Sequence, residues 1–97
     1  QLPYSSWCGA WLKYQNFSDS DLEGALLTDA MLEKTIFADC NLKGADFSRA
    51  KLRGVSFMNA NLQGADFENC DLTDADFRGA NLEGARFPGA VLKNVKR

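Results

Sequence analysis

The sequence predicts an all-β solenoid, a quadrilateral parallel β-helix with about 20 residues per coil, and three observations lead to this fold class. Large apolar residues recur every five positions, small residues precede them by two, and residues that favour positive φ close each unit. Oppositely charged residues recur 20 positions apart. The chain of 97 residues has room for one domain, which at this period makes nearly five coils.

The five-residue period defines the inward positions. Every Phe, and every Leu except Leu26, lies in one register that runs from Leu2 to Leu92 in steps of five. Small residues such as Cys40 and Ala45 stand two positions earlier with a mostly polar residue between, which is the alternation of a very short strand. A fixed step of five forms no apolar stripe on an α-helix, so helix is excluded.

The two remaining residues of each unit are predicted to be the centre of a type II turn. Gly, Asn or Asp occupies the second of these positions, and after the first ten residues only Tyr14, Lys34 and Arg49 depart from the rule. The segment 87–90 sets the frame, because Pro followed by Gly is typical of the two central residues of such a turn. A corner every five residues closes the chain into a square after four units.

The period of 20 is supported by the outward charges and by the inward residues. Residues at this separation would stack at about 4.8 Å, the spacing of parallel strands. Opposite charges would then meet in Lys13 with Glu33, Glu33 with Arg53, Glu23 with Lys43, Asp29 with Arg49, and Lys51 with Asp71; like charges would meet in Asp19 with Asp39 and Asp46 with Asp66. The inward columns would be Leu12 to Leu92, Phe17 to Phe77, Leu22 to Leu82, and Trp7 with Leu27, Phe47, Phe67 and Phe87.

Several units follow one pattern: a small residue, Asp or Asn, Leu or Phe, and two polar residues. The units 45–49, 60–64, 65–69 and 80–84 fit it fully. With this pattern the chain resembles the pentapeptide-repeat family, and the resemblance implies a right-handed quadrilateral β-helix over residues 10–97. Residues 1–9 are expected to form an amino-terminal cap or irregular first units. Members of the family are abundant in bacteria, particularly cyanobacteria, and also occur in thylakoid lumens.

The composition argues against several classes of function. A net charge of −2, spread along the chain, does not favour direct binding of nucleic acid or of an anionic membrane. No apolar run approaches the roughly 18 residues of a membrane span. Histidine is absent, glycines occur singly, and outward carboxylates on flat faces form no pocket, so we predict no catalytic, cofactor-binding or metal site and no enzyme.

The three cysteines are predicted to remain free. Cys40 and Cys70 occupy inward small-residue positions on opposite faces, farther apart than the roughly 7 Å that a disulfide spans between Cα atoms. Cys8 lies at an outward corner, and the sequence assigns it no role. Reduced, buried thiols favour a cytoplasmic setting, while the family resemblance also allows the thylakoid lumen.

One surface patch departs from the family pattern. Trp11, Leu26, Met31 and Ile36 occupy the middle of their short strands, where Asp or Asn is usual. Trp11 and Met31 should stack on one face, with Leu26 and Ile36 on its two flanks. Contiguous exposed apolar surface is typical of an interaction site. Two interpretations are open: the first ten residues fold back over the patch as a cap, or the patch binds a protein partner.

The carboxy-terminal end forms a second candidate contact. Only residues 93–97 follow Leu92, and they are too few and too polar to cover the last coil. An open final coil exposes core residues and strand edges to another chain. We therefore expect a contact through Phe87, Leu92 and Val95, either with a second copy in a homodimer or with further sequence.

Two functions follow from these observations. The first is a non-catalytic protein-interaction scaffold, whose protein partner the sequence does not identify. The alternative is a DNA-mimicking inhibitor or protector of DNA gyrase, of the quinolone-resistance type, which the resemblance implies for some family members. The nearly neutral charge of this chain weighs against DNA mimicry.

Overall fold

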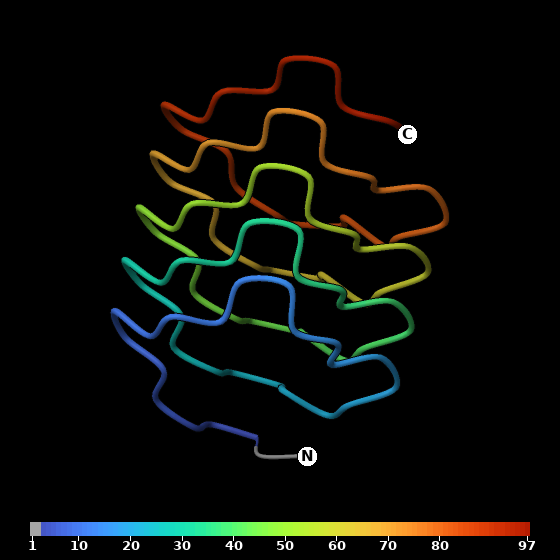
Figure 1. The fold of residues 1–97 in the computed structure, drawn as a ribbon. Coiled ribbons are helices and arrows are strands. Elements are labelled where there is room, and N and C mark those ends of the chain that lie inside the picture. The colour runs from blue at the N-terminus through green and yellow to red at the C-terminus, as the bar shows by residue number, and fades with distance from the viewer. Residues whose placement is uncertain (1–2) are drawn as a thin grey trace.

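The computed structural model describes residues 3–97, whose backbone rises as a stack of coils from the N-terminus to the C-terminus (Figure 1). Over these residues the structure contains neither helices nor extended strands. Each five-residue unit instead contributes one bridging residue, from Ser6 to Lys96, and one two-residue turn, from 3–4 to 93–94.

The bridges are all parallel, and each joins two residues that lie twenty positions apart in the sequence. The bridging residues form four columns along the stack, and they are the outward, middle residues of the predicted short strands. The first column holds Ser6, Leu26, Asp46, Asp66 and Arg86, the second Trp11, Met31, Lys51, Asp71 and Val91, the third Asn16, Ile36, Ser56, Asp76 and Lys96, and the fourth Asp21, Asn41, Asn61 and Asn81.

The backbone hydrogen bonds explain why a unit of five residues suffices. In one unit the N–H of Asp46 donates to Ala25 O of the preceding coil at 3.0 Å, and the N–H of Phe47 donates to Asp66 O of the following coil at 2.8 Å. The N–H of Ala50 closes the turn onto Phe47 O at 2.9 Å. Each inner coil is therefore bonded to both neighbours at its bridging positions, as a parallel ladder requires.

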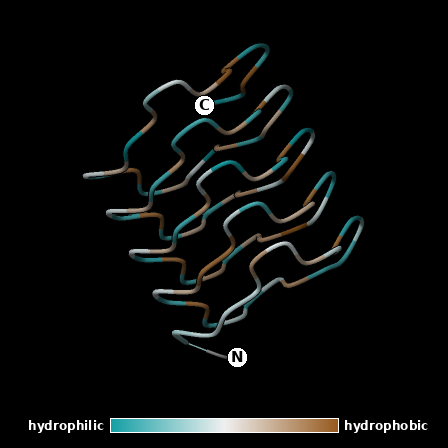
Figure 2. Ribbon diagram, turned by 90° about the vertical axis from the view of Figure 1, so that its left-hand side faces the viewer, coloured by the Kyte–Doolittle hydropathy of each residue, from teal (hydrophilic) through white to brown (hydrophobic). Residues whose placement is uncertain are grey.

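The core consists of stacked rings and Leu side chains. Phe37 and Phe57 stack with their ring centroids 5.5 Å apart, and Phe47 and Phe67 stack at 5.0 Å. The two stacks meet edge to face, since Phe47 and Phe57 lie 5.4 Å apart at 77°. Figure 2 shows hydrophobic segments recurring at corresponding places in successive coils. The predicted Phe columns are confirmed.

The corners keep one backbone conformation whatever residue occupies them. Tyr14, Lys34 and Arg49, the three departures from the turn pattern, have φ of 63°, 58° and 61°. Left-handed backbone costs a residue with a Cβ roughly 1 kcal/mol. The ladder on either side and the buried Leu or Phe of each unit therefore impose the corner against local preference.

Residues 3–9 continue the coil and do not fold over the outward surface. The N–H of Tyr4 donates to Glu23 O and that of Trp7 to Leu26 O, both at 2.7 Å. Trp7 keeps to the inward register and packs edge to face on Phe17 at 6.0 Å. The interpretation of this segment as a cap that folds back over the patch is not the arrangement observed; residues 1 and 2 of the expected segment 1–9 lie outside the described residues.

The outward charges pair only partly as expected. Lys13 lies 4.0 Å from Glu33, and Arg49 pairs with Asp29 at 3.1 Å. Asp71 does not form the expected ion pair with Lys51. It pairs instead with Arg53, eighteen residues away, whose Nε lies 2.7 Å from Asp71 Oδ2. The corner position of Arg53 and its long side chain bring the guanidinium to the carboxylate from the side.

At the carboxy-terminal end, Val91 and Leu92 are exposed, while Phe87 and Val95 are half-buried against the core. The N–H groups of Phe87 and Leu92, which in earlier coils would donate to the following coil, have no acceptor within residues 3–97. Within residues 3–97 the last coil thus carries partly exposed apolar side chains and ladder N–H groups without a backbone acceptor.

Candidate partner-binding surface

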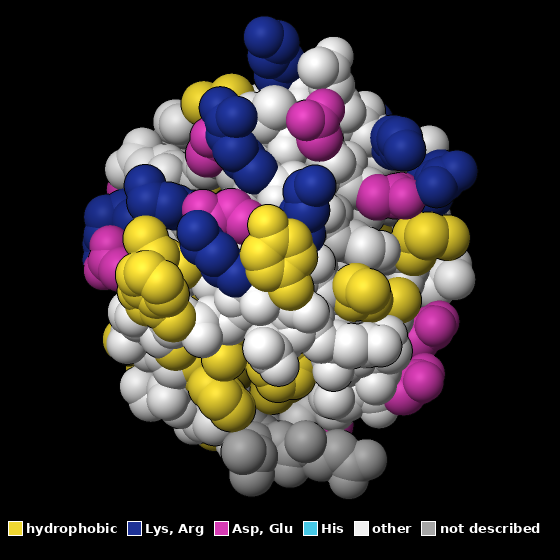
Figure 3. Space-filling model, viewed as in Figure 1, with side chains coloured by type: hydrophobic (Ala, Val, Ile, Leu, Met, Phe, Trp, Pro, Cys, Tyr) yellow, Lys and Arg dark blue, Asp and Glu magenta, His cyan; other side chains and the backbone are white. Residues whose placement is uncertain are grey.

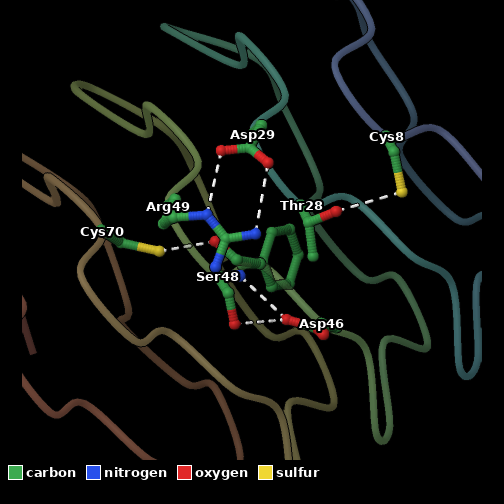
Figure 4. A network of polar contacts seen from close by, with 8 residues as sticks. Cys8, Thr28, Asp29, Asp46, Ser48, Arg49 and Cys70 are labelled. Carbon is green, nitrogen blue, oxygen red and sulfur yellow. Dashed lines mark hydrogen bonds and ion pairs between the residues drawn. The ribbon is translucent and has the colours of Figure 1, made fainter.

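In most units the outward, middle residue of the strand has a structural role. Asp46 Oδ1 accepts a hydrogen bond from the N–H of Ser48 at 2.9 Å (Figure 4), and Asn61 Oδ1 accepts one from the N–H of Gln63 at 3.1 Å. This N–H is the one that the ladder and the turn leave without a backbone acceptor. Asp and Asn fit because their short side chains reach the N–H two residues on.

The same bond explains the fourth column. Asn41, Asn61 and Asn81 stack in successive coils, as their bridges show. Their side-chain oxygens accept the N–H two residues further on, as at Asn41 with Lys43. No hydrogen bond joins the three amides to one another within the described residues, so the amide ladder that stacked asparagines suggest is replaced by three separate caps.

The four apolar residues of the predicted patch cannot form such caps. We call them the apolar belt: Trp11, Leu26, Met31 and Ile36. A cap contributes on the order of 0.5–1.5 kcal/mol when its N–H is otherwise unpaired. The four N–H groups two residues after the belt residues have no acceptor among residues 3–97; they are those of Lys13, Thr28, Glu33 and Ala38. The belt thus gives up four stabilising bonds in neighbouring units.

The carboxy-terminal region shows that a missing cap can be harmless. Arg86 is another outward residue that offers no acceptor to the N–H two positions on. That position is Pro88, which has no N–H to satisfy. The belt residues lack this compensation, since Lys13 and Glu33 both keep a backbone donor.

The structure places the predicted belt residues together on the N-terminal coils. Trp11 bridges Met31, as predicted, and Leu26, Met31 and Ile36 are successive bridging residues of one coil. Trp11 is 76% exposed and Met31 is half-buried beside it, while Leu26 and Ile36 are exposed. On the face seen in Figure 3, hydrophobic side chains gather in the lower half, toward the N-terminal end, and most Lys and Arg side chains lie above them.

Sequence reasoning missed Tyr14, which is 71% exposed and belongs to the same surface. It stands at a turn position, where only its departure from Gly, Asn or Asp signalled it. Its neighbour Lys13 lies with Nζ 5.7 Å from the centre of the Trp11 ring, within reach of a cation–π interaction. Lys13 is also 4.0 Å from Glu33 Oε2, while Glu33 Oε1 is buried without a hydrogen-bond donor.

The three thiols lie in two different environments, and Figure 4 shows one thiol in each, Cys8 and Cys70. Cys8 is exposed, and hydrogen bonds from the hydroxyls of Thr28, at 3.0 Å, and of Ser6 lower its pKa. Cys40 and Cys70 are buried and free, as predicted. Burial raises the pKa of both, that of Cys70 to about 12, and each thiol lies within hydrogen-bond distance of a backbone carbonyl of the preceding coil.

The described residues offer surfaces rather than clefts. Residues 3–97 line no pocket, and they contain no group of His, Cys, Asp and Glu side chains placed to hold a metal ion. Nor do they include a helix of the length and apolarity that crossing a membrane requires. The chemistry that the belt offers is apolar contact with backbone N–H donors beside it.

A family model for the pentapeptide repeat region matches residues 30–96 of the chain. The chain belongs to the pentapeptide-repeat family. This confirms the resemblance seen in the sequence, and the right-handed β-helix is the fold of the family. Comparison with curated proteins gives no match.

Solved structures of other pentapeptide-repeat proteins are similar to this chain. Rfr23 of the cyanobacterium Cyanothece 51142 is 37% identical over 91% of the chain, with a TM-score of 0.87. A protein of the Arabidopsis thaliana thylakoid lumen is 32% identical over 93%, with a TM-score of 0.77. The plasmid-mediated fluoroquinolone resistance protein QnrB1 is 26% identical over 93%, with a TM-score of 0.62. The chain spans 60%, 59% and 58% of these three structures.

Proposed function

We propose that this pentapeptide-repeat protein is a non-catalytic interaction scaffold, a quadrilateral rod of nearly five coils whose apolar belt binds a protein partner. One observation carries the proposal. Four neighbouring units carry apolar side chains at the outward position where Asp or Asn would cap a backbone N–H, so selection for stability alone would favour the polar residues. Proteins of this family are generally structural or interaction proteins.

The fold suits such a role because it holds the belt rigidly. Trp11 and Met31 are fixed by ladder bonds, since the N–H of Leu12 donates to Met31 O and the N–H of Met31 donates to Ala10 O. The partner therefore meets a surface that is already ordered and need not lose backbone entropy on binding. Trp is also among the residues that contribute most to protein interfaces.

The test is a pull-down from cells that contain the protein, with variants that convert the belt to the family pattern. We expect Trp11→Asn and Met31→Asn to lose a specific bound protein, because they remove apolar contact while restoring a cap. Val91→Asn is the matched control, since Val91 lies in the same column and is exposed at the other end. A bound protein that is retained by both belt variants would contradict the proposal.

The carboxy-terminal coil supplies a second contact in the proposed scaffold. Phe87, Leu92 and Val95 lie on the last described coil, and we propose that a second copy packs there in a homodimer. The basic residues Lys93, Lys96 and Arg97 would then face their own copies, so the dimer should strengthen as salt screens them. Sedimentation equilibrium over a range of salt and protein concentrations tests this; a strict monomer throughout would contradict it.

The alternative function, protection or inhibition of DNA gyrase, is favoured by the likeness to QnrB1. It is opposed by the outward charge, because a mimic of B-DNA needs a continuous negative surface and this chain carries 11 basic against 13 acidic residues. Gyrase supercoiling in the presence of a quinolone separates the two functions. Unchanged supercoiling at high molar excess of the protein would exclude the alternative.

A further inference from the structure

We propose that a surface that shares Trp11 and Met31 with the apolar belt binds an extended acidic segment of the partner protein. This inference rests on the proposed scaffold function and adds the chemistry of the partner. The surface comprises residues 11–14, 31–34 and 51–54, and we call it the basic corner. It includes the outward residues Trp11, Met31 and Lys51 of the second column and the turn that follows each of them.

A row of unpaired backbone donors runs along the basic corner. The N–H groups of Lys13, Glu33 and Arg53 have no acceptor within residues 3–97, because the residue two positions before each one offers no Asp or Asn oxygen. They belong to successive coils and are therefore stacked at about 4.8 Å, the spacing of parallel strands. In the next coil Asp71 caps the N–H of Thr73 at 3.1 Å, so the row ends there.

The charge of the basic corner is opposite to that of the chain. It carries four Lys or Arg side chains and a single Glu, whereas the whole protein has a net charge of −2. Within the described residues Lys34 and Lys51 form no ion pair, and Arg53 pairs with Asp71 at its border. Free cations beside unpaired N–H groups favour carboxylates as ligands, since both act as donors to the same oxygens.

Two exposed aromatic side chains indicate a polypeptide rather than a free anion. Trp11 and Tyr14 are exposed aromatic side chains that would receive an apolar side chain between the acidic residues. The occupant is therefore an extended segment of Asp and Glu residues around an apolar one.

The backbone of the basic corner presents its side chains at a cost to stability. Tyr14 and Lys34 both have positive φ in successive coils of this corner, where Gly or Asn would be unstrained. Gly54 leaves room for Lys34, because a Cβ at Gly54 would lie 3.1 Å from Lys34 Cγ. Backbone strain and missing caps thus occur at the same corner. The strained residues Tyr14 and Lys34 and the uncapped N–H groups are the groups that the proposed segment would contact.

The experiment uses the full chain, ¹⁵N-labelled, with a short fluorescein-labelled peptide of Asp and Glu around a central Leu-Phe pair. We expect amide shifts concentrated at Lys13, Glu33 and Arg53, and affinity that falls with added salt. The charge reversal Lys34→Glu should weaken binding about tenfold or more by fluorescence anisotropy. Lys43→Glu changes the net charge equally at an exposed corner between the fourth and first columns and should leave affinity within about twofold.

Several outcomes would overturn the proposal. If a control peptide with Asn and Gln in place of Asp and Glu binds with equal affinity, the surface does not recognise the negative charge of the peptide. The same shifts with inorganic phosphate, or tighter binding of a single-stranded oligonucleotide, would assign the corner to another ligand. If the peptide fails while the pull-down depends on Met31, the scaffold function stands and the acidic segment is wrong. If neither peptide binding nor the pull-down depends on residues of the basic corner or of the apolar belt, both proposals fail.

Discussion

The N-terminal coils and the middle coils share one core but differ on the outside. In both, Leu or Phe points inward every five residues, and the rings stack from Phe17 to Phe77 without a break. In the middle coils most outward residues cap their own turns, as Asp66 does for the N–H of Glu68 at 3.0 Å, and Lys51 is an exception. In the N-terminal coils Leu26 and Met31 do not. The inner register therefore specifies the fold, and the outer one is free to carry function.

The largest effect on stability should appear when an Asp is placed at an inward position and, for comparison, at an outward position of a strand. Leu62 is fully buried between coils, so Leu62→Asp buries a carboxylate without a partner and should cost more than about 4 kcal/mol, with loss of cooperative unfolding. Leu26→Asp places the carboxylate outside, where it caps the N–H of Thr28, and should change the free energy of unfolding by less than about 1 kcal/mol. Thermal and urea melts check both; similar losses for the two variants would contradict the register.

The thiols offer a contrast that needs no mutation. Of the three free cysteines, Cys8 is exposed in the first coil with a lowered pKa, whereas Cys40 and Cys70 are buried with raised ones. At neutral pH a thiol reagent such as Ellman's should react rapidly at Cys8 alone, because the thiolate is the nucleophile. The other two should react only when the protein unfolds. Rapid release of more than one equivalent in the native state would contradict this arrangement.

Exchanging the outward residues of the two regions tests the cap. Asn61→Met removes the acceptor for the N–H of Gln63 and should lower the free energy of unfolding by about 1 kcal/mol. The reverse change, Met31→Asn, should raise it by up to about 1 kcal/mol while it abolishes partner binding. Urea unfolding of both variants against the parent measures the two changes. Destabilisation by Met31→Asn would indicate that contact with Trp11 outweighs the cap.

The smallest expected effect is on the stability of the protein at low pH. The hydroxyl of Thr73 and then the Arg53 guanidinium hold the pKa of Asp71 at about 2, although partial burial opposes them. A lowered pKa contributes stability above the ordinary pKa of an aspartate, and this stability is lost as the pH falls toward 2. Because Asp71 is partly exposed, solvent screening limits its contribution to below about 1 kcal/mol. Asp71→Asn should flatten the pH dependence of unfolding between pH 4 and 2, and an unchanged slope would contradict the assignment.

The path of the chain follows from the amino-acid pattern alone. Inward Leu and Phe, small residues two positions before them, and Gly, Asn or Asp at the corners are steric requirements that each unit meets locally. Reading them at a period of 20 predicted the Phe columns, the buried thiols and the stacking of Trp11 on Met31. The predicted belt was visible for the same reason, since an apolar residue in an outward position breaks a local rule.

Features that depend on contacts between neighbouring coils could be seen only in the folded protein. Tyr14 and Lys34 take left-handed backbone because the ladder around them fixes the corner, which no local preference predicts. Arg53 displaces Lys51 from Asp71 because the reach of a side chain, rather than the column it stands in, selects the partner. The uncapped N–H groups of Lys13, Glu33 and Arg53 form a row because the bridges stack their three coils. Local steric requirements set the repeat. The partner of a hydrogen bond or ion pair between coils depends on which of several nearby groups a side chain reaches, and this is defined only in the folded protein.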